Sequence, residues 1–189
     1  MSEKTSHKHC SLLATTAHGV LIEIHGLGVL IIGKSGTGKS DAALDLISKG
    51  SKLISDDIVI VTKSSSDKLI GTSPNNTKYL MEIRGLGIIN IKNLYGADSV
   101  INEKQIDIVV ELAKWDSDTE YDRLGIEEKS FTILEVDLPY LLIPVNPGRN
   151  IATILEVAAL NQLLKSSDAK AIERILDQLE NVKTATDLK

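Results

Sequence analysis

The feature that most constrains this chain is a short glycine-rich segment that ends in a lysine and a serine. Gly33, Gly38, Lys39 and Ser40 fit the pattern G-x-x-x-x-G-K-[ST] of a phosphate-binding loop. In such a loop, backbone N–H groups curl around the phosphates, the lysine reaches the outer phosphates, and the serine hydroxyl can bind Mg²⁺. The spacing therefore predicts a nucleotide site that uses the whole loop: Gly33, Lys34, Ser35, Gly36, Thr37, Gly38, Lys39 and Ser40.

The residues on either side of the loop fit the same interpretation. Val29–Ile32 is a short, continuous apolar run, which is typical of a buried strand. Lys39–Lys49 carries apolar residues at helical spacing, and Gly50 suits the end of that helix. The helix would point its positive dipole end at the bound phosphates. A strand, a phosphate loop and a helix are thus expected in that order.

The rest of the chain shows no internal repeat and no linker long enough to divide it. The run Ile83–Ile91 is unusual, because glycines at 85 and 87 interrupt an apolar stretch. Strands are predicted at Val20–Ile24, Leu53–Val61, Ile106–Leu112, Phe131–Val136 and Tyr140–Val145, the last two around Pro139, and helices at Ile151–Leu164 and Asp168–Leu179. This order predicts a mixed α/β domain with a helical C-terminus.

Length and charge narrow the class of protein. A chain of 189 residues suffices for one domain with a core, and its net charge of −5 argues against non-specific binding to nucleic acid or anionic lipid. No stretch reaches the roughly 18 apolar residues of a membrane span. Cys10 is the only cysteine, and with His7 and His9 it is expected to lie in a mobile tail rather than a metal site. We therefore expect a cytoplasmic protein with no nucleic-acid or membrane partner.

A phosphate loop alone does not separate a GTPase, an ATP-driven motor and a kinase. The chain has no N/T-K-x-D motif for reading guanine, and the D-x-x-G match at residues 122–125 is short. Motors usually need a larger chain or a second domain. A phosphotransferase needs a base for the acceptor hydroxyl and positive charge around the transferred group. Arg84, Arg123 and Arg149 are candidates for the positive charge, because a planar guanidinium suits phosphate.

Two adjacent carboxylates, Asp56 and Asp57, are candidates for the base. Asp57 follows Lys39 by 18 residues. That separation exceeds the roughly 10–12 residues that a βαβ crossover needs, so the strand with the aspartates can lie beside the strand that feeds the loop. Neighbouring residues on a strand face opposite sides, which predicts different roles for the two carboxylates.

Four segments of the chain resemble one family. They are AHGVLIEIHGLGVLIIGKSGTGKSD, LISDD, MEIRGLGIIN and NPGRNIATILEVAALN. Together they are similar to the catalytic domain of bacterial HPr kinase/phosphorylase over about Thr15–Leu164. The resemblance implies a P-loop-containing mixed sheet, a nucleotide domain like that of phosphoenolpyruvate carboxykinase, and C-terminal helices. It divides the chain into a tail at 1–14, a catalytic domain at 15–165, and a C-terminal helix and tail at 166–189.

The resemblance also implies an activity. Enzymes of this family use ATP, and often pyrophosphate, with Mg²⁺ (Mn²⁺ is a possible substitute) to phosphorylate a serine of the phosphocarrier protein HPr. Many remove that phosphate with inorganic phosphate, and they are typically hexamers. We accordingly expect HPr or an HPr-like carrier as protein substrate, and a homo-oligomer.

The resemblance assigns roles to individual residues. His18 and Arg123 match the active-site histidine and arginine, and Lys39 matches the lysine of the phosphate loop. Ser40 and Glu82 match the magnesium ligands. The aspartate pair matches the base, with a marginal preference for Asp57 as the base and Asp56 as its helper. The loop linked to dephosphorylation matches Pro147, Gly148 and Arg149, and Asn150 is expected to cap the helix after it.

The chain departs from the family pattern in three places. It lacks the N-terminal domain common in the family, as short forms do. Lys34 stands where an acidic residue is frequent, and Asn146 where many members have arginine, which predicts weaker phosphorolysis. Two other functions remain open at this point, a kinase of a small hydroxyl substrate and a nucleotide-sensing module that no longer turns over.

Overall fold

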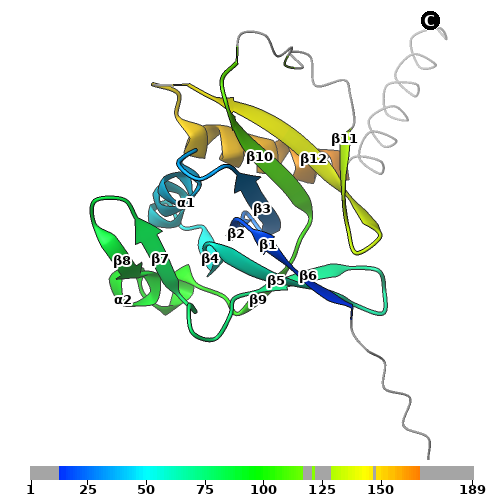
Figure 1. Cartoon of the computed structure of the whole chain (residues 1–189), viewed down its shortest axis with the longest axis horizontal. Helices are drawn as coiled ribbons and strands as arrows, with labels where there is room; N and C mark the ends of the chain where they lie inside the picture. The colour runs from blue at the N-terminus through cyan, green and yellow to red at the C-terminus, as the bar shows by residue number, and fades with distance from the viewer. Residues whose placement is uncertain (1–12, 117–120, 122–128, 147, 167–189) are drawn as a thin grey trace, which may run out of the picture.

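The computed structural model describes residues 13–116, 121, 129–146 and 148–166. A six-stranded sheet runs through its centre, in the order β11-β12-β10-β3-β2-β4. The bounds of these strands are β2 (Val20–Ile24), β3 (Leu27–Gly33), β4 (Lys52–Ser55), β10 (Ile108–Lys114), β11 (Lys129–Ile133) and β12 (Val136–Val145). Figure 1 shows this sheet with helices on one side and a smaller sheet near its lower end.

Two hydrophobic clusters cover the two faces of the central sheet. On one face, side chains of β2, β3 and β10 pack against helix α1 (Lys39–Ser48) and against the helix at 151–166. On the other face, the alternate residues of the same strands pack against a four-stranded sheet with the order β1-β5-β6-β9. That sheet consists of β1 (Ala14–His18), β5 (Ile58–Lys63), β6 (Leu69–Thr72) and β9 (Glu103–Gln105). The central strands are therefore buried on both sides, as their continuous apolar runs predict.

A separate hairpin completes the described structure. It pairs β7 (Leu80–Ile83) with β8 (Gly87–Asn90) and leads into the short helices α2 (Ile91–Tyr95) and η1 (Ala97–Ser99). This hairpin explains the glycines of the unusual apolar run. Gly85 lies at the third position of a turn closed by the Leu86 N–H and the Ile83 carbonyl, with a φ of 86° that favours glycine.

The topology places the phosphate loop at one edge of the central sheet. β10 runs parallel to both β3 and β12, with Leu112 opposite Gly33 and Lys114 opposite Val145. The carboxyl ends of the three strands therefore lie at the same edge. In open α/β sheets this edge is where ligands bind. The loop after β3 and the loop after β12 both emerge there.

Two strand predictions were wrong, and both corrections bear on the site. The predicted strand Leu53–Val61 is two strands, β4 and β5, which belong to different sheets and are separated by a bend at Asp56 and Asp57. Nor does β4 lie beside β3, because β2 lies between them. The hairpin β2–β3 turns at His25 and Gly26, both with positive φ, and this local pairing occupies the edge of β3.

The break predicted at Pro139 lies five residues earlier. Leu134 and Glu135 have φ angles of 47° and 62° and form a two-residue hairpin turn between β11 and β12. Pro139 lies within β12, and pairing with β10 begins at Tyr140, just after it. The predicted helix at Asp168–Leu179 and residues 1–12 of the predicted tail lie outside the described residues, whereas Ala14, which was counted in the tail, is the first residue of β1. Within the described part of the chain, no helix is long and apolar enough to span a membrane.

Candidate active site

The phosphate loop has the strand–loop–helix setting that its spacing predicts. β3 ends at Gly33, where a Cβ atom would lie 2.3 Å from the Leu112 carbonyl oxygen, so only glycine fits beside β10. The loop then leads directly into α1. The Lys39 ammonium folds back across it and donates hydrogen bonds to the carbonyls of Gly33 (2.9 Å) and Lys34 (3.3 Å). Thr37 is buried, and its hydroxyl also donates to the Lys34 carbonyl.

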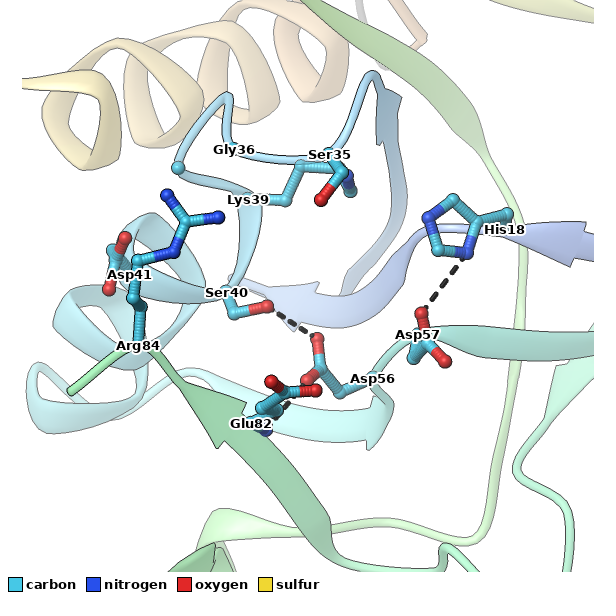
Figure 2. A pocket seen from close by; sticks show the side chains of 11 residues that line it. His18, Ser35, Gly36, Lys39, Ser40, Asp41, Asp56, Asp57, Glu82 and Arg84 are labelled. Atoms are coloured by element: carbon cyan, nitrogen blue, oxygen red, sulfur yellow. Dashed lines mark hydrogen bonds and ion pairs between the residues drawn. The ribbon is translucent and has the colours of Figure 1, made fainter. Parts of the chain in front are cut away.

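Asp56 is the buried member of the aspartate pair, with only 6% of its surface exposed. Its Oδ1 accepts a hydrogen bond from the Ser40 hydroxyl at 2.9 Å, and its Oδ2 accepts one from the Glu82 backbone N–H at 3.1 Å. Burial raises the pKa of the Asp56 carboxyl, these two hydrogen bonds oppose the rise, and the nearby charge of Asp57 adds to it. Asp56 thus joins the phosphate loop to the strand that carries Glu82 (Figure 2).

Asp57 is the exposed member of the pair, with 67% of its side chain open to solvent. Its backbone has a φ of 69°, which turns the chain sharply between β4 and β5. The Asp57 Oδ1 lies 3.1 Å from the His18 Nδ1, and the Asp57 carbonyl accepts a hydrogen bond from Gly19. The two carboxylates lie in different environments because the chain bends between β4 and β5, and not because they alternate along one strand as the sequence suggested.

The β7–β8 hairpin carries Glu82 and Arg84 to the same place. Figure 2 shows Glu82 beside Asp56, and Arg84 close to the phosphate loop. The Arg84 guanidinium nitrogens lie 3.7 Å from where a Cβ of Gly36 would be. The hairpin therefore brings one carboxylate and one guanidinium to the loop from a distant part of the sequence.

These side chains line a cleft of about 230 Å³. It contains four carboxylates but only one lysine and one arginine, so its side chains carry an excess of negative charge. A polyphosphate would bind there more readily together with a divalent cation. The lining residues are His18, Ser35, Gly36, Gly38, Lys39, Ser40, Asp41, Asp56, Asp57, Glu82 and Arg84.

Most of the predicted site residues lie in or beside this cleft. The exceptions among the described residues are Gly148 and Arg149, which line a neighbouring cleft instead. Arg123 and Pro147 lie outside the described residues. The sequence makes Arg84 a candidate for the positive charge but does not single out Asp41. Asp41 has no signal in the sequence beyond its place directly after the loop.

A magnesium ion would need partners besides the protein. No group of three or more His, Cys, Asp or Glu side chains is arranged as a metal site within the described ranges. Mg²⁺ commonly keeps several waters and binds through one or two carboxylates together with substrate phosphates. The Ser40 hydroxyl, held by Asp56, and the carboxylate of Glu82 fit that kind of donor set.

Comparison with known proteins agrees with the fold. Residues 11–179 match the model of the HPr Serine kinase C-terminal domain. The chain is 48% identical over 181 residues to an HPr kinase/phosphorylase of Geobacillus thermodenitrificans, covering 95% of this chain and 59% of that protein. It is 46% identical over 182 residues to an HPr kinase/phosphorylase of Bacillus subtilis, covering 96% and 59%.

A solved structure gives the same result. The Hpr(Ser) kinase/phosphatase from Coxiella burnetii superposes with a TM-score of 0.77 at 29% identity, covering 85% of this chain and 98% of that one. The chain spans about three fifths of the length of the two bacterial relatives. The family match, the identities and the superposition confirm the predicted resemblance and fold class. The chain belongs to the family of the HPr Serine kinase C-terminal domain.

Proposed function

We propose that this chain is a Mg²⁺- and ATP-dependent kinase that phosphorylates a serine of HPr or of an HPr-like phosphocarrier. One observation carries the proposal. The serine of the phosphate loop is hydrogen-bonded to a buried aspartate, and an exposed aspartate follows directly in the chain, in the same cleft. The names of the relatives, which are HPr kinase/phosphorylases, support the choice of protein substrate.

The metal position follows from the hydrogen bond between Ser40 and Asp56. The Ser40 hydroxyl donates a hydrogen bond to Asp56, so the lone pairs of the Ser40 oxygen stay available to a cation. Glu82 adds a hard oxygen ligand on the same side of the cleft. When bound, Mg²⁺ or Mn²⁺ neutralises charge on the phosphates. Asp56 is therefore the positioning residue for this site rather than the base.

Asp57 is suited to act as the base. Its carboxylate is exposed to an incoming hydroxyl, and one of its oxygens lies 3.1 Å from Nδ1 of His18. In the forward reaction the serine oxygen bonds to the γ-phosphorus, the bond from that phosphorus to the β–γ bridging oxygen breaks, and ADP leaves. The serine proton passes to Asp57. A base so placed typically contributes about 10²–10⁴-fold to the rate.

Cationic side chains would stabilise the transferred group. Lys39 exchanges its loop carbonyl partners for phosphate oxygens, and Arg84 approaches the loop from the hairpin. Charge spread over the equatorial oxygens in the transition state makes such donors effective. The resemblance adds Arg123 to this set. In the reverse direction, inorganic phosphate would remove the serine phosphate and yield pyrophosphate.

The test is direct phosphorylation. Purified chain, MgATP and HPr are incubated, and the intact mass of HPr is followed with time. We expect HPr to gain one phosphoryl group on a serine, and no gain in an HPr variant that lacks the acceptor serine. If HPr gains no phosphate while a small hydroxyl compound does, the chain is a small-molecule kinase. If ATP binds but nothing is phosphorylated, the chain is a nucleotide-sensing module.

A further inference from the structure

A second cleft opens beside the phosphate loop, and the function proposed above leaves it without a role. Its volume is about 420 Å³. It is formed by the end of the loop, the first turns of α1, and the segment from the end of β12 to the start of the helix at 151–166. The two clefts share Gly38 and Asp41, so they meet at the N-terminus of α1.

The position of this second cleft relates it to the phosphate donor. If the transferred phosphoryl group lies near Asp57 and Ser40, the acceptor serine must enter on the side of Asp57. The part of the donor beyond its phosphates must then extend away from the loop in another direction. The second cleft adjoins the loop at Gly38, and it lies at the carboxyl ends of β3 and β12, where ligands of α/β sheets bind.

The chemistry of the walls favours a neutral, flat group over a second phosphate. Ala42, Val145 and Ile151 supply apolar surface, while Asp41 and Asp45 place two carboxylates against the single cation of Arg149. An anion would meet more negative than positive charge there. The volume lies within the 300–1,000 Å³ typical of small-molecule sites.

The polar groups of the cleft are held by the protein. Nη1 of Arg149 donates to the Pro144 carbonyl at 2.9 Å, which leaves the guanidinium face available for stacking on an aromatic ring. Lys49 lies 3.0 Å from Oδ2 of Asp45 and holds a carboxylate that can accept hydrogen bonds. Oδ1 of Asn150 accepts the Thr153 N–H at 3.0 Å, and this predicted cap fixes the start of the helix.

We propose that this second cleft binds the nucleoside of the phosphate donor, with Arg149 stacked on the base and Asp45 accepting hydrogen bonds from the sugar hydroxyls or from an amino group of the base. The inference rests on the proposed function, because it takes a nucleoside triphosphate as the donor. It gives Arg149 a role different from the phosphate binding for which its residue type made it a candidate.

The experiment compares MgATP with magnesium tripolyphosphate, which has the phosphates but no nucleoside. Titration calorimetry on the full chain measures both affinities. We expect Arg149→Ala to weaken ATP binding about 3- to 30-fold, the range of a stacked cation, and to leave tripolyphosphate binding unchanged. Arg149→Lys keeps the charge but loses the planar face, so the ATP-specific loss should persist.

A matched pair of variants distinguishes the contribution of the cleft carboxylate to ATP binding from that of its ion pair on the helix surface. Asp45→Ala removes a cleft carboxylate and its pair with Lys49, whereas Lys49→Ala removes the same pair from outside the cleft. Asp45→Ala should weaken ATP binding about 3- to 10-fold, and Lys49→Ala, which keeps the carboxylate but removes the group that holds it, should weaken ATP binding by less than Asp45→Ala does. Melting curves confirm that each variant is folded.

The outcomes are distinguishable. If Arg149→Ala weakens both ligands equally, the cleft is a phosphate site and the inference is wrong. If the wild-type chain binds ATP and tripolyphosphate with equal affinity, the nucleoside makes no contact, and the inference fails while the proposed kinase stands. If the wild-type chain binds neither ligand, the proposed function itself fails.

Discussion

Replacing Asp56 with asparagine should have opposite effects on stability and on function. The Asp56 carboxylate is almost fully buried, and its pKa is raised because the cost of burial exceeds the gain from two hydrogen bonds. Asparagine removes the buried charge and keeps the shape. Its Oδ1 can still accept the Glu82 N–H, and its amino group can donate to the Ser40 oxygen. The ligand-free protein should therefore become more stable.

The size of this gain can be bounded. A single stabilising substitution commonly gives about 0.5–2 kcal/mol. For a chain of 150–250 residues, 1 kcal/mol shifts the melting temperature by about 2–4 °C. We expect Asp56→Asn to melt a few degrees above the wild type at pH 7, measured without nucleotide or magnesium. Asp67→Asn, which loses only an exposed ion pair with Lys63, is the control and should change the melting temperature little.

The pH dependence of stability tests independently whether Asp56→Asn stabilises the protein. A carboxyl group with a raised folded-state pKa binds its proton more tightly in the folded than in the unfolded protein. The wild type therefore loses stability as the pH rises from the ordinary value of about 3.9 through the raised pKa. The difference between Asp56→Asn and wild type should narrow as the pH falls through that window. A variant less stable than wild type at pH 7, or a difference independent of pH, would refute the reasoning.

The functional cost follows from the same hydrogen bond. In Asp56→Asn, the amide would donate to Oγ of Ser40 and occupy a lone pair that the metal needs. The kinase rate should fall by at least tenfold at low magnesium and recover in part as magnesium is raised. A rate equal to that of the wild type at every magnesium concentration would exclude Asp56 from positioning Ser40.

Three further expectations follow from the structure and the resemblance. Lys39→Ala should reduce transfer by 10²-fold or more with the fold intact, because the lysine would bind the outer phosphates; an unchanged rate in a folded variant would remove the phosphate loop from the reaction. Light scattering should give a homo-oligomer, a hexamer by resemblance, since Val157 (58% exposed) and Leu160 (42%) present apolar surface on the helix at 151–166; a monomer at micromolar concentration contradicts this. Asn146→Arg should raise phosphorolysis more than kinase activity. Equal changes in the two activities would disprove that the loop after β12 distinguishes phosphorolysis from the kinase reaction.

Local constraints explain what the sequence could predict. The phosphate loop, β3 and α1 follow from glycine, lysine and apolar positions within about twenty residues. The hairpin β2–β3 and the cap at Asn150 are also local. Each depends on contacts between residues close in the chain, and such contacts leave a clear trace in spacing and residue type.

Contacts between distant segments explain what it could not. Asp56 and Asp57 look like part of one strand, because nothing local shows that the chain changes sheets between them. Arg84 reaches the phosphate loop only because the hairpin packs beside it, and Arg149 lies in a neighbouring cleft because of where β12 ends. Spacing indicated which residue types were present but not which cleft each one would join.

The central claim is that Asp57 is the base of a serine kinase, and one rate comparison tests it most directly. HPr phosphorylation is followed by intact mass with wild type, Asp57→Asn and Asp67→Asn. The two aspartates are matched, since both are exposed and both have a positive φ, which asparagine tolerates. We expect Asp57→Asn to bind MgATP like the wild type and to phosphorylate HPr about 10²–10⁴-fold more slowly, with Asp67→Asn unchanged. A folded Asp57→Asn variant that phosphorylates HPr at the wild-type rate would contradict the account.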